Sequence, residues 1–398
     1  MSITLNTFFP LCLTDEGVSH TCLSLCEHMA CDALDVRVWA PASRKSARRG
    51  FTRDAIPTWL QAVAYRLARS DARLRAFAEK RFAASIRPDD AAYIWPGTTD
   101  GFAARLKHSV RTVITERINC HSGTAIRIME RVYADLGWPL RSALSADAPA
   151  RETEELAACD YVFSPSPFVT ASLVEFGTHP SKIIRTSYGW NPHRLGNSSR
   201  AIPAADGCTF VFVGRLCVRK GVPTLLRAWR RAKLKGRLVL AGSIAPDVAE
   251  GCAADLTAAG VIHLPFTSNV GSIYRSGDVF VFPSHEEGSP LVMYEAMGVG
   301  LPSLISPIAA GAIVRDGVEG LHVDPNDVDA IADRMNVLAG NPDLRREMGT
   351  KARAQALEYT WQKVAVRRRE QLLALPEFGH GTTAMKMCHT DTTLSAIR

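Results

Sequence analysis

The sequence of 398 residues has no hydrophobic run long enough to cross a membrane as a helix. Such a run needs about 20 apolar residues, whereas the 46% of hydrophobic residues here fall in short stretches. The N-terminal segment MSITLNTFFPLCLTDEG also lacks the basic beginning and the small-residue cleavage site of a secretory signal. We therefore predict a cytoplasmic protein, either free or peripheral on the cytoplasmic face of the membrane.

None of the ten cysteines forms a CxxC pair. In the cytoplasm they are expected to be reduced thiols, packed as small hydrophobic side chains. Five residues of metal-binding type do lie close together: His20, Cys22, Cys26, His28 and Cys31. A zinc site there is one reading, but the leucines between them favour an ordinary amphipathic helix, so we expect no metal.

The net charge of +7 is concentrated in residues 44–87, which hold twelve Lys and Arg against three Asp and Glu. Within this stretch, residues 57–84 have helical spacing. The apolar face and the basic face consist of Trp59, Leu60, Val63 and Leu67, and of Arg66, Arg69 and Arg73. Either the apolar face packs on the domain, or the helix rests on an anionic membrane surface. No aromatic interleaving accompanies the charge, so we expect no nucleic-acid partner.

Short apolar runs alternate with helical segments along the whole chain. The expected strands are 2–9, 34–41, 92–97, 111–117, 161–166 and 182–189 in the first half, and 210–214, 237–242, 261–265, 278–284, 302–306 and 320–324 in the second. The expected helices are 18–30, 57–84, 124–136, 150–158, 167–176, 225–232, 253–260, 294–300 and 330–340. Uniformly apolar strands that alternate with helices indicate parallel sheets covered on both faces.

This pattern predicts an α/β protein with two Rossmann-like, doubly wound domains that face each other across a cleft. A polar segment rich in Pro and Gly separates the two halves. The expected parts are an N-terminal domain (1–195), a linker (196–207), a C-terminal domain (208–360), a terminal helix (361–375) that can return to the first domain, and a disordered tail (376–398).

Two glutamates eight positions apart, Glu287 and Glu295, flank the segment GSPLVMY. Ser289 is a good N-cap and Pro290 suits the first helical position, so the amides of Leu291 and Val292 would be free to bind phosphate oxygens. Carboxylates accept hydrogen bonds from paired hydroxyls. The spacing therefore fits a nucleotide sugar, with the sugar at Glu287 and the ribose at Glu295.

A second segment, GRLCVRKG at 214–221, follows another predicted strand and supplies Arg215 and Lys220. The guanidinium can contact two phosphate oxygens at once, and the ammonium adds a point charge. Gly214 and Gly288 are expected to allow close backbone approach. Because parallel strands end at one edge of a sheet, both segments should meet at one site.

The patterns GRLxxxKG and PSxxEGxxLxxxEAMxxGxP resemble the nucleotide-binding domain of the retaining family 4 glycosyltransferases, which have the GT-B fold. The resemblance covers residues 208–345 well and 150–191 more loosely. It implies sugar transfer from a nucleotide diphosphate to an acceptor hydroxyl with retention of configuration, in glycan or surface-polysaccharide synthesis. It also implies that Arg215, Lys220 and the helix start neutralise the leaving diphosphate without a metal or other cofactor, with Glu287 as the third catalytic residue. The resemblance further implies that the first domain binds the acceptor, a glycan or a lipid-linked glycan, and that the second binds the nucleotide sugar.

In the first domain the resemblance places the donor phosphate beside Gly17. Where the family has a glycine pair, this chain has Glu16, whose carboxylate would repel phosphate unless it turns away or binds the acceptor. His121 is expected at the donor sugar or the acceptor, with a structural role as the alternative. Glu116 and Arg117 either have a functional role in the cleft or form an ion pair with each other.

The base-binding loop should follow the strand 261–265. Two alternatives to transfer remain at this stage: an inactive subunit that binds sugar nucleotides, and a nucleotide-sugar epimerase, which the two motifs favour less.

Overall fold

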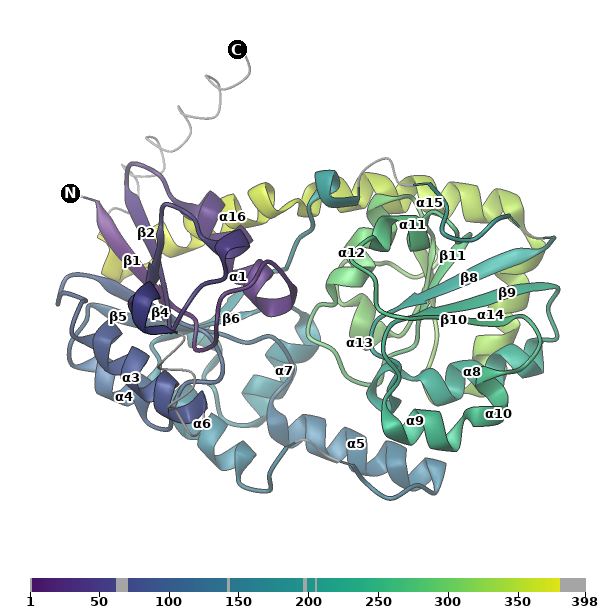
Figure 1. The fold of residues 1–398 in the computed structure, drawn as a ribbon, viewed down its shortest axis with the longest axis horizontal. Helices are drawn as coiled ribbons and strands as arrows, with labels where there is room; N and C mark the ends of the chain where they lie inside the picture. The colour runs from purple at the N-terminus through teal and green to yellow at the C-terminus, as the bar shows by residue number, and fades with distance from the viewer. Residues whose placement is uncertain (1, 62–70, 142–143, 196–198, 205, 380–398) are drawn as a thin grey trace, which may run out of the picture.

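The computed structural model describes residues 2–61, 71–141, 144–195, 199–204 and 206–379, which form two parallel sheets side by side (Figure 1). The first sheet has seven strands in the order β3-β2-β1-β4-β5-β6-β7. These are β1 (Ile3–Phe8), β2 (Leu34–Ala40), β3 (Thr52–Asp54), β4 (Ala91–Ile94), β5 (Thr112–Glu116), β6 (Tyr161–Ser164) and β7 (Ile183–Arg185). Every residue of β1, β4 and β5 is buried, as in a sheet covered on both faces.

The second sheet has six strands in the order β10-β9-β8-β11-β12-β13. They are β8 (Cys208–Val213), β9 (Gly236–Ala241), β10 (Val261–Leu264), β11 (Val279–Phe282), β12 (Ser303–Ile305) and β13 (Gly320–His322). The predicted fold class is confirmed, with twelve of these thirteen strands anticipated. The exception, β3, has only three residues, too few for an apolar pattern to be recognised.

Helices cover both sheets. Those of the first half are α1 (Gly17–Met29), α3 (Asp71–Ala83), α4 (Phe102–Lys107), α5 (Ser122–Leu136), α6 (Ala148–Ala158) and α7 (Pro167–Glu175). Those of the second half are α8 (Val222–Ala232), α9 (Pro246–Gly251), α10 (Ala253–Leu256), α11 (Val270–Tyr274), α12 (Leu291–Gly298), α13 (Pro307–Ala310), α14 (Val328–Gly340), α15 (Pro342–Ala356) and α16 (Trp361–Leu373). In α8, for example, Leu225 and Trp229 are buried while Arg230 faces solvent, the spacing of an amphipathic helix.

The C-terminal helix α16 crosses from the second domain and lies against α1 of the first (Figure 1). Its Arg368 is fully buried and donates to Glu116 at the end of β5, at 2.8 and 3.2 Å. The suggestion that Glu116 pairs with Arg117 is therefore wrong: Arg117 pairs with Glu152, at 2.5 Å. Consecutive residues of an extended segment point in opposite directions, so these neighbours serve different faces.

A second connection joins α5 to α9 at the opposite end of the cleft. Tyr133 of α5 donates its hydroxyl to Asp247, and Arg141 lies 3.2 Å from Glu250. The cleft is thus bounded at both ends by contacts between the domains.

Part of the basic segment and most of the tail, residues 62–70 and 380–398, lie outside the described residues, so Val63, Arg66, Leu67 and Arg69 of the predicted basic helix are not placed. Among the residues described, no helix is both long and apolar enough to span a bilayer.

Candidate functional site

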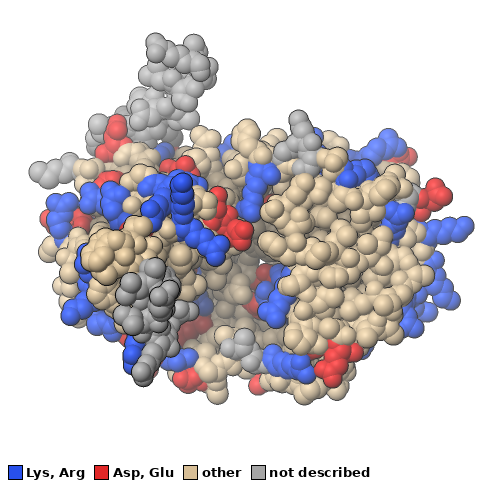
Figure 2. All heavy atoms as spheres, in the orientation of Figure 1, with Lys and Arg blue, Asp and Glu red and all other residues tan. Residues whose placement is uncertain are grey.

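Three cavities follow one another along the cleft between the domains, which Figure 2 shows as a hollow between the two halves. The middle one, of about 190 Å³, is lined by Gly17 at the start of α1 and by Glu287, Ser289 and Leu291 of the second domain. It shares Ile118 and Asn119 with a cavity of about 570 Å³ on one side. On the other side, Gly17 adjoins Glu16, which lines a cavity of about 920 Å³.

Glu287 is held by the cationic turn that follows β8. Lys220 Nζ lies 2.7 Å from Glu287 Oε1, and Arg219 Nη1 lies 3.3 Å from the same oxygen. Burial raises the pKa of Glu287, but the two cations outweigh burial and bring its pKa below the usual glutamate value. The motifs GRLxxxKG and EGxxLxxxE therefore meet in space, with an ionised carboxylate between them.

Arg219 also holds the site together, although the motifs did not reveal it, because GRLxxxKG allows any residue at its position. Its Nη1 bonds both the carboxylate and the carbonyl of Glu286 at 2.9 Å, and its own carbonyl accepts from His285 N, also at 2.9 Å. These contacts fasten the turn after β8 to the loop after β11. Glu286 also accepts from Cys120 Sγ of the first domain, at 3.4 Å.

Arg215 is exposed and lines the 570 Å³ cavity. Within the described part of the chain, no ion pair is seen for it. The charge of Lys220 is shared with Glu287, so Arg215 is the more available of the two cations for an anionic ligand.

Helix α12 begins at Leu291, one residue later than predicted. Pro290 is extended, with ψ of 124°, and occupies the N-cap position. Ser289 is therefore not the N-cap: its hydroxyl instead bonds the hydroxyl of Tyr294, at 2.7 Å. Leu291 still lines the middle cavity at the start of the helix, whereas Val292 is half-buried beside it and is not among the lining residues.

Glu295 lies in the next turn of α12 and accepts a hydrogen bond from Tyr274, at 2.9 Å. Burial raises the pKa of Glu295, although the tyrosine hydroxyl and Arg194 favour the charged form. Among the described residues Tyr274 is the one hydrogen-bond donor seen for this carboxylate, which leaves lone pairs for a ligand hydroxyl.

At two positions of the site the backbone requires glycine, in one case for space and in the other for its φ angle. A Cβ on Gly288 would stand 1.8 Å from the carbonyl oxygen of Ile118, so only glycine lets the domains approach here. Gly214 has φ of 142°, which L-residues rarely adopt, and lies against the Lys220 side chain.

His121 is fully buried and is the N-cap of α5. Its ring stacks on Phe176 at 4.0 Å, Nδ1 accepts from Gly123 N, and Nε2 lies 3.2 Å from Thr153 Oγ1. Both nitrogens are engaged by protein and the ring has no exposed surface, so the expected donor contact is not seen and the structural alternative fits. Burial lowers the pKa of His121, so the ring is neutral at pH 7.

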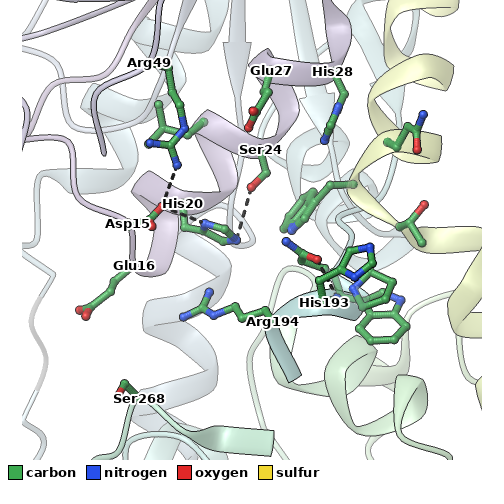
Figure 3. A pocket seen from close by; sticks show the side chains of 17 residues that line it. Asp15, Glu16, His20, Ser24, Glu27, His28, Arg49, His193, Arg194 and Ser268 are labelled. Carbon is green, nitrogen blue, oxygen red and sulfur yellow. Dashed lines mark hydrogen bonds and ion pairs between the residues drawn. The ribbon is translucent and has the colours of Figure 1, made fainter. Parts of the chain in front are cut away.

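The 920 Å³ cavity lies between α1, the start of α16 and the crossover at Trp190–Arg194 (Figure 3). Asp15 turns toward His20 and Arg49, at 3.6 and 3.4 Å, while Glu16 points away from both. Ser268, just after β10, also lines it, so this end adjoins the loop expected to bind the base. Glu16 thus lines a neighbouring cavity and not the one beside Gly17.

The group weighed as a zinc site does not assemble. Among the residues described, no three His, Cys, Asp or Glu side chains converge as metal ligands. Cys22 and Cys26 are buried in the core, and the described cysteines are free thiols.

Comparison with known proteins agrees with this geometry. Residues 207–341 match the family model described as glycosyl transferases group 1. Sucrose-phosphate synthase from Thermosynechococcus elongatus superposes with a TM-score of 0.69 at 19% identity, over 94% of this chain and 99% of that one. This chain has the GT-B fold. The Anabaena protein HepE, solved with UDP and glucose, shares that fold with a TM-score of 0.66 at 12% identity, over 94% and 100% of the two chains.

Among curated relatives, the D-inositol 3-phosphate glycosyltransferase of Actinosynnema mirum is 30% identical over 222 residues, which are 50% of this chain and 52% of that protein. An uncharacterized glycosyltransferase of Haemophilus influenzae is 28% identical over 181 residues, 44% and 51% of the two chains. The chain spans about half the length of the curated relatives it matches.

Proposed function

We propose that this GT-B protein is a glycosyltransferase that moves a sugar from a nucleotide diphosphate to an acceptor hydroxyl, with retention of anomeric configuration. The observation that carries the proposal is that Glu287, paired with Lys220, and the start of α12 line one cavity in the cleft. Cations and a helix N-terminus suit a diphosphate. A carboxylate beside them suits sugar hydroxyls.

The donor lies along the cleft in a fixed direction. Its nucleoside points toward Glu295 and the loop after β10, its diphosphate sits at the start of α12, and its sugar lies near Glu287. The helix starts at Gly17 and Leu291 both line the middle cavity and bring partial positive charge to it. This direction rests on the expected binding of the base by the loop after β10, whose Ser268 lines the 920 Å³ cavity.

The chemistry is a displacement at the anomeric carbon. The bond to the diphosphate oxygen breaks, and that oxygen leaves with the electron pair while the acceptor oxygen bonds the same face of the carbon. The acceptor's proton passes to the departing phosphate oxygen. The protein's main contribution is to stabilise the charge that develops on the diphosphate, through Arg215, Lys220 and the amides of the helix start.

The test is the kinetics of Arg215→Ala and Lys220→Ala. Each should lower kcat about a hundredfold, because one charged contact in the transition state is lost, while KM for the donor changes less. Arg215→Lys should recover only part of the rate, since an ammonium lacks the two-pronged geometry. The exposed Arg334→Ala is the control. Wild-type kcat in Arg215→Ala would contradict the proposed role.

Activity should persist in excess EDTA, because Arg215 and Lys220 neutralise the leaving group. Strict dependence on Mg²⁺ or Mn²⁺ would overturn this part of the proposal. An inactive binding subunit would bind UDP- or GDP-sugars without transferring or hydrolysing them, and an epimerase would release an altered sugar nucleotide. Product analysis therefore separates all three.

We propose further that the basic segment 44–87 contacts an anionic membrane, where a lipid-linked glycan acceptor would be found. Trp59 is 78% exposed, and Lys45, Arg48 and Arg53 are exposed nearby in the chain. Figure 2 shows basic side chains gathered on the upper part of this domain. Sedimentation with phosphatidylglycerol vesicles, but not with phosphatidylcholine vesicles, should show binding that Trp59→Ser weakens. Equal binding to both would count against it.

A further inference from the structure

The 570 Å³ cavity lies on the far side of Ile118 and Asn119 from the cavity that holds Glu287. The first domain contributes the residues after β5 and one face of α5, and the second contributes Arg215, Arg219 and Glu286. With the nucleoside placed at the opposite end of the cleft, the cavity lies beyond the donor sugar.

The adjacent residues Glu286 and Glu287, on one loop, line different cavities. Glu287 lines the middle cavity, whereas Glu286 lines the larger one. Glu286 is 1% exposed and is fixed by Arg219 from one domain and by Cys120 from the other. The loop is therefore a thin partition between the two cavities.

The wall from the first domain carries buried polar groups that the donor site does not use. Ser122, at the start of α5, is 6% exposed, and its hydroxyl has no hydrogen-bond partner among the described residues. Arg117 Nε is likewise buried without a partner in the described part of the chain. Arg117 Nη2 and Glu152 Oε1 pair at 2.5 Å beside them. Buried polar atoms without partners are rare and call for an explanation. A molecule bound in the adjoining cavity would supply one, with a small rotation of these side chains toward it.

The rest of this wall is apolar. Ala125 and Met129 follow Ser122 along the same face of α5, and Pro96 and Leu144 add to the lining. A pyranose ring presents hydroxyls at its edge and C–H groups on its faces, so it matches a polar end beside an apolar wall. In this cavity Arg117 is paired with Glu152 and Arg219 with Glu286. Arg215 also lines it, but the proposed function assigns its charge to the donor diphosphate. With the donor bound, the remaining space therefore favours a neutral ring over an anion.

We propose that this cavity binds the acceptor, as a neutral pyranose that carries an apolar substituent. Ser122, Arg117 and Glu152 bond the ring hydroxyls, Ala125 and Met129 contact its apolar parts, and Glu286 orients the hydroxyl that faces the donor sugar. The assignment rests on the proposed transferase function, because it takes the direction of the donor from it.

The test is saturation-transfer NMR with p-nitrophenyl glycosides of the common hexopyranoses, on the full chain with UDP or GDP present. At least one glycoside should receive saturation on its ring and nitrophenyl protons. Met129→Trp fills the cavity from a half-buried position and should abolish that signal. Ser122→Ala should weaken binding about tenfold, the effect of one lost hydrogen bond. Glu152→Gln should weaken it similarly.

The matched control is Glu130→Gln on the exposed face of α5, which should leave glycoside binding unchanged. The saturation-transfer signals of UDP or GDP should be the same in all variants. This result would also show that every variant is folded. Binding that survives Met129→Trp, or no binding of any glycoside to the wild type, overturns the acceptor assignment alone. If neither UDP nor GDP binds the wild type, the proposed function falls and the assignment falls with it.

Discussion

The Glu287 carboxylate depends on two cations of a neighbouring turn, so a change there should separate turnover from binding. In Glu287→Gln we expect kcat to fall about a hundredfold, because the charge beside the donor sugar is lost. The dissociation constant for UDP or GDP should stay within about threefold, since Lys220 is released for the phosphates. Steady-state kinetics and calorimetry check this, with the exposed Glu347→Gln as control. A loss of diphosphate affinity equal to the loss of kcat would place Glu287 at the phosphates instead.

The effect of Glu287→Gln on the free energy of unfolding should depend on pH. The cations hold the pKa of Glu287 below its value in the unfolded chain, so its ion pairs stabilise the fold above the unfolded-state pKa, and that stability is lost as pH falls through the folded-state pKa. Glu287→Gln should therefore be less stable than the wild type at pH 7, and the difference should shrink at acidic pH. Urea unfolding at a series of pH values measures it; a difference independent of pH would contradict the ion-pair account.

Glu295 should behave in the opposite way. Burial raises the pKa of Glu295, so the charged form opposes folding increasingly as pH rises from the unfolded-state pKa through the folded one. Glu295→Gln, which can still accept from Tyr274, should be more stable than the wild type at pH 7 and about equal at pH 4. Nucleoside diphosphate affinity should fall about tenfold, because a charge-assisted hydrogen bond becomes a neutral one. Thermal unfolding with and without UDP or GDP distinguishes the two effects.

At the scale of elements, α16 is fastened to the first domain by one buried ion pair. Arg368 and Glu116 are both fully inaccessible, and Tyr188 also donates to Glu116, at 2.9 Å. Arg368→Met leaves the buried carboxylate without its cation and should cost about 3–5 kcal/mol of stability. Arg368→Met combined with Glu116→Gln should cost less than the sum of the two single changes.

Denaturant unfolding of the four proteins gives this coupling energy. The exposed Arg334→Met on α14 is the control and should change stability by no more than about 0.5 kcal/mol. Additive single effects would mean that the pairing of Arg368 with Glu116 does not fasten α16 to the first domain.

At the scale of the whole molecule, the width of the cleft is set where Gly288 meets Ile118. In Gly288→Ala the new methyl group would overlap the Ile118 carbonyl, and the domains would have to separate. We expect kcat to fall about a hundredfold, since displacement of reacting groups by about 1 Å has an effect of that size, while each domain stays folded. Small-angle scattering should show a larger radius of gyration. Gly340→Ala, which meets nothing within 4 Å, is the control.

The sequence by itself determined the fold class, twelve of the thirteen strands and most of the longer helices, because local periodicity reports which faces of a strand or helix are buried. It did not indicate α15. It also identified the segments 214–221 and 287–295, since residues close in the chain at a strand end stay together in any parallel sheet. Individual side-chain pairs between distant elements could not be predicted, although strand ends indicated that those two segments would meet. Arg368 joins Glu116 across 252 positions, and nothing local marks either as the other's partner.

Only the tertiary structure decided that His121 is a buried cap, that Ser289 bonds Tyr294 and that Glu286 and Glu287 serve different cavities. The contact of Ser289 and the separation of Glu286 from Glu287 depend on the direction of a side chain in a loop or at a helix start. Sequence periodicity does not predict that direction. The burial of His121 depends on neighbours from α6 and α7 that close over the ring. A sequence specifies which residues have the chemistry to bind a ligand. Packing between distant elements determines which of those residues remain accessible to it.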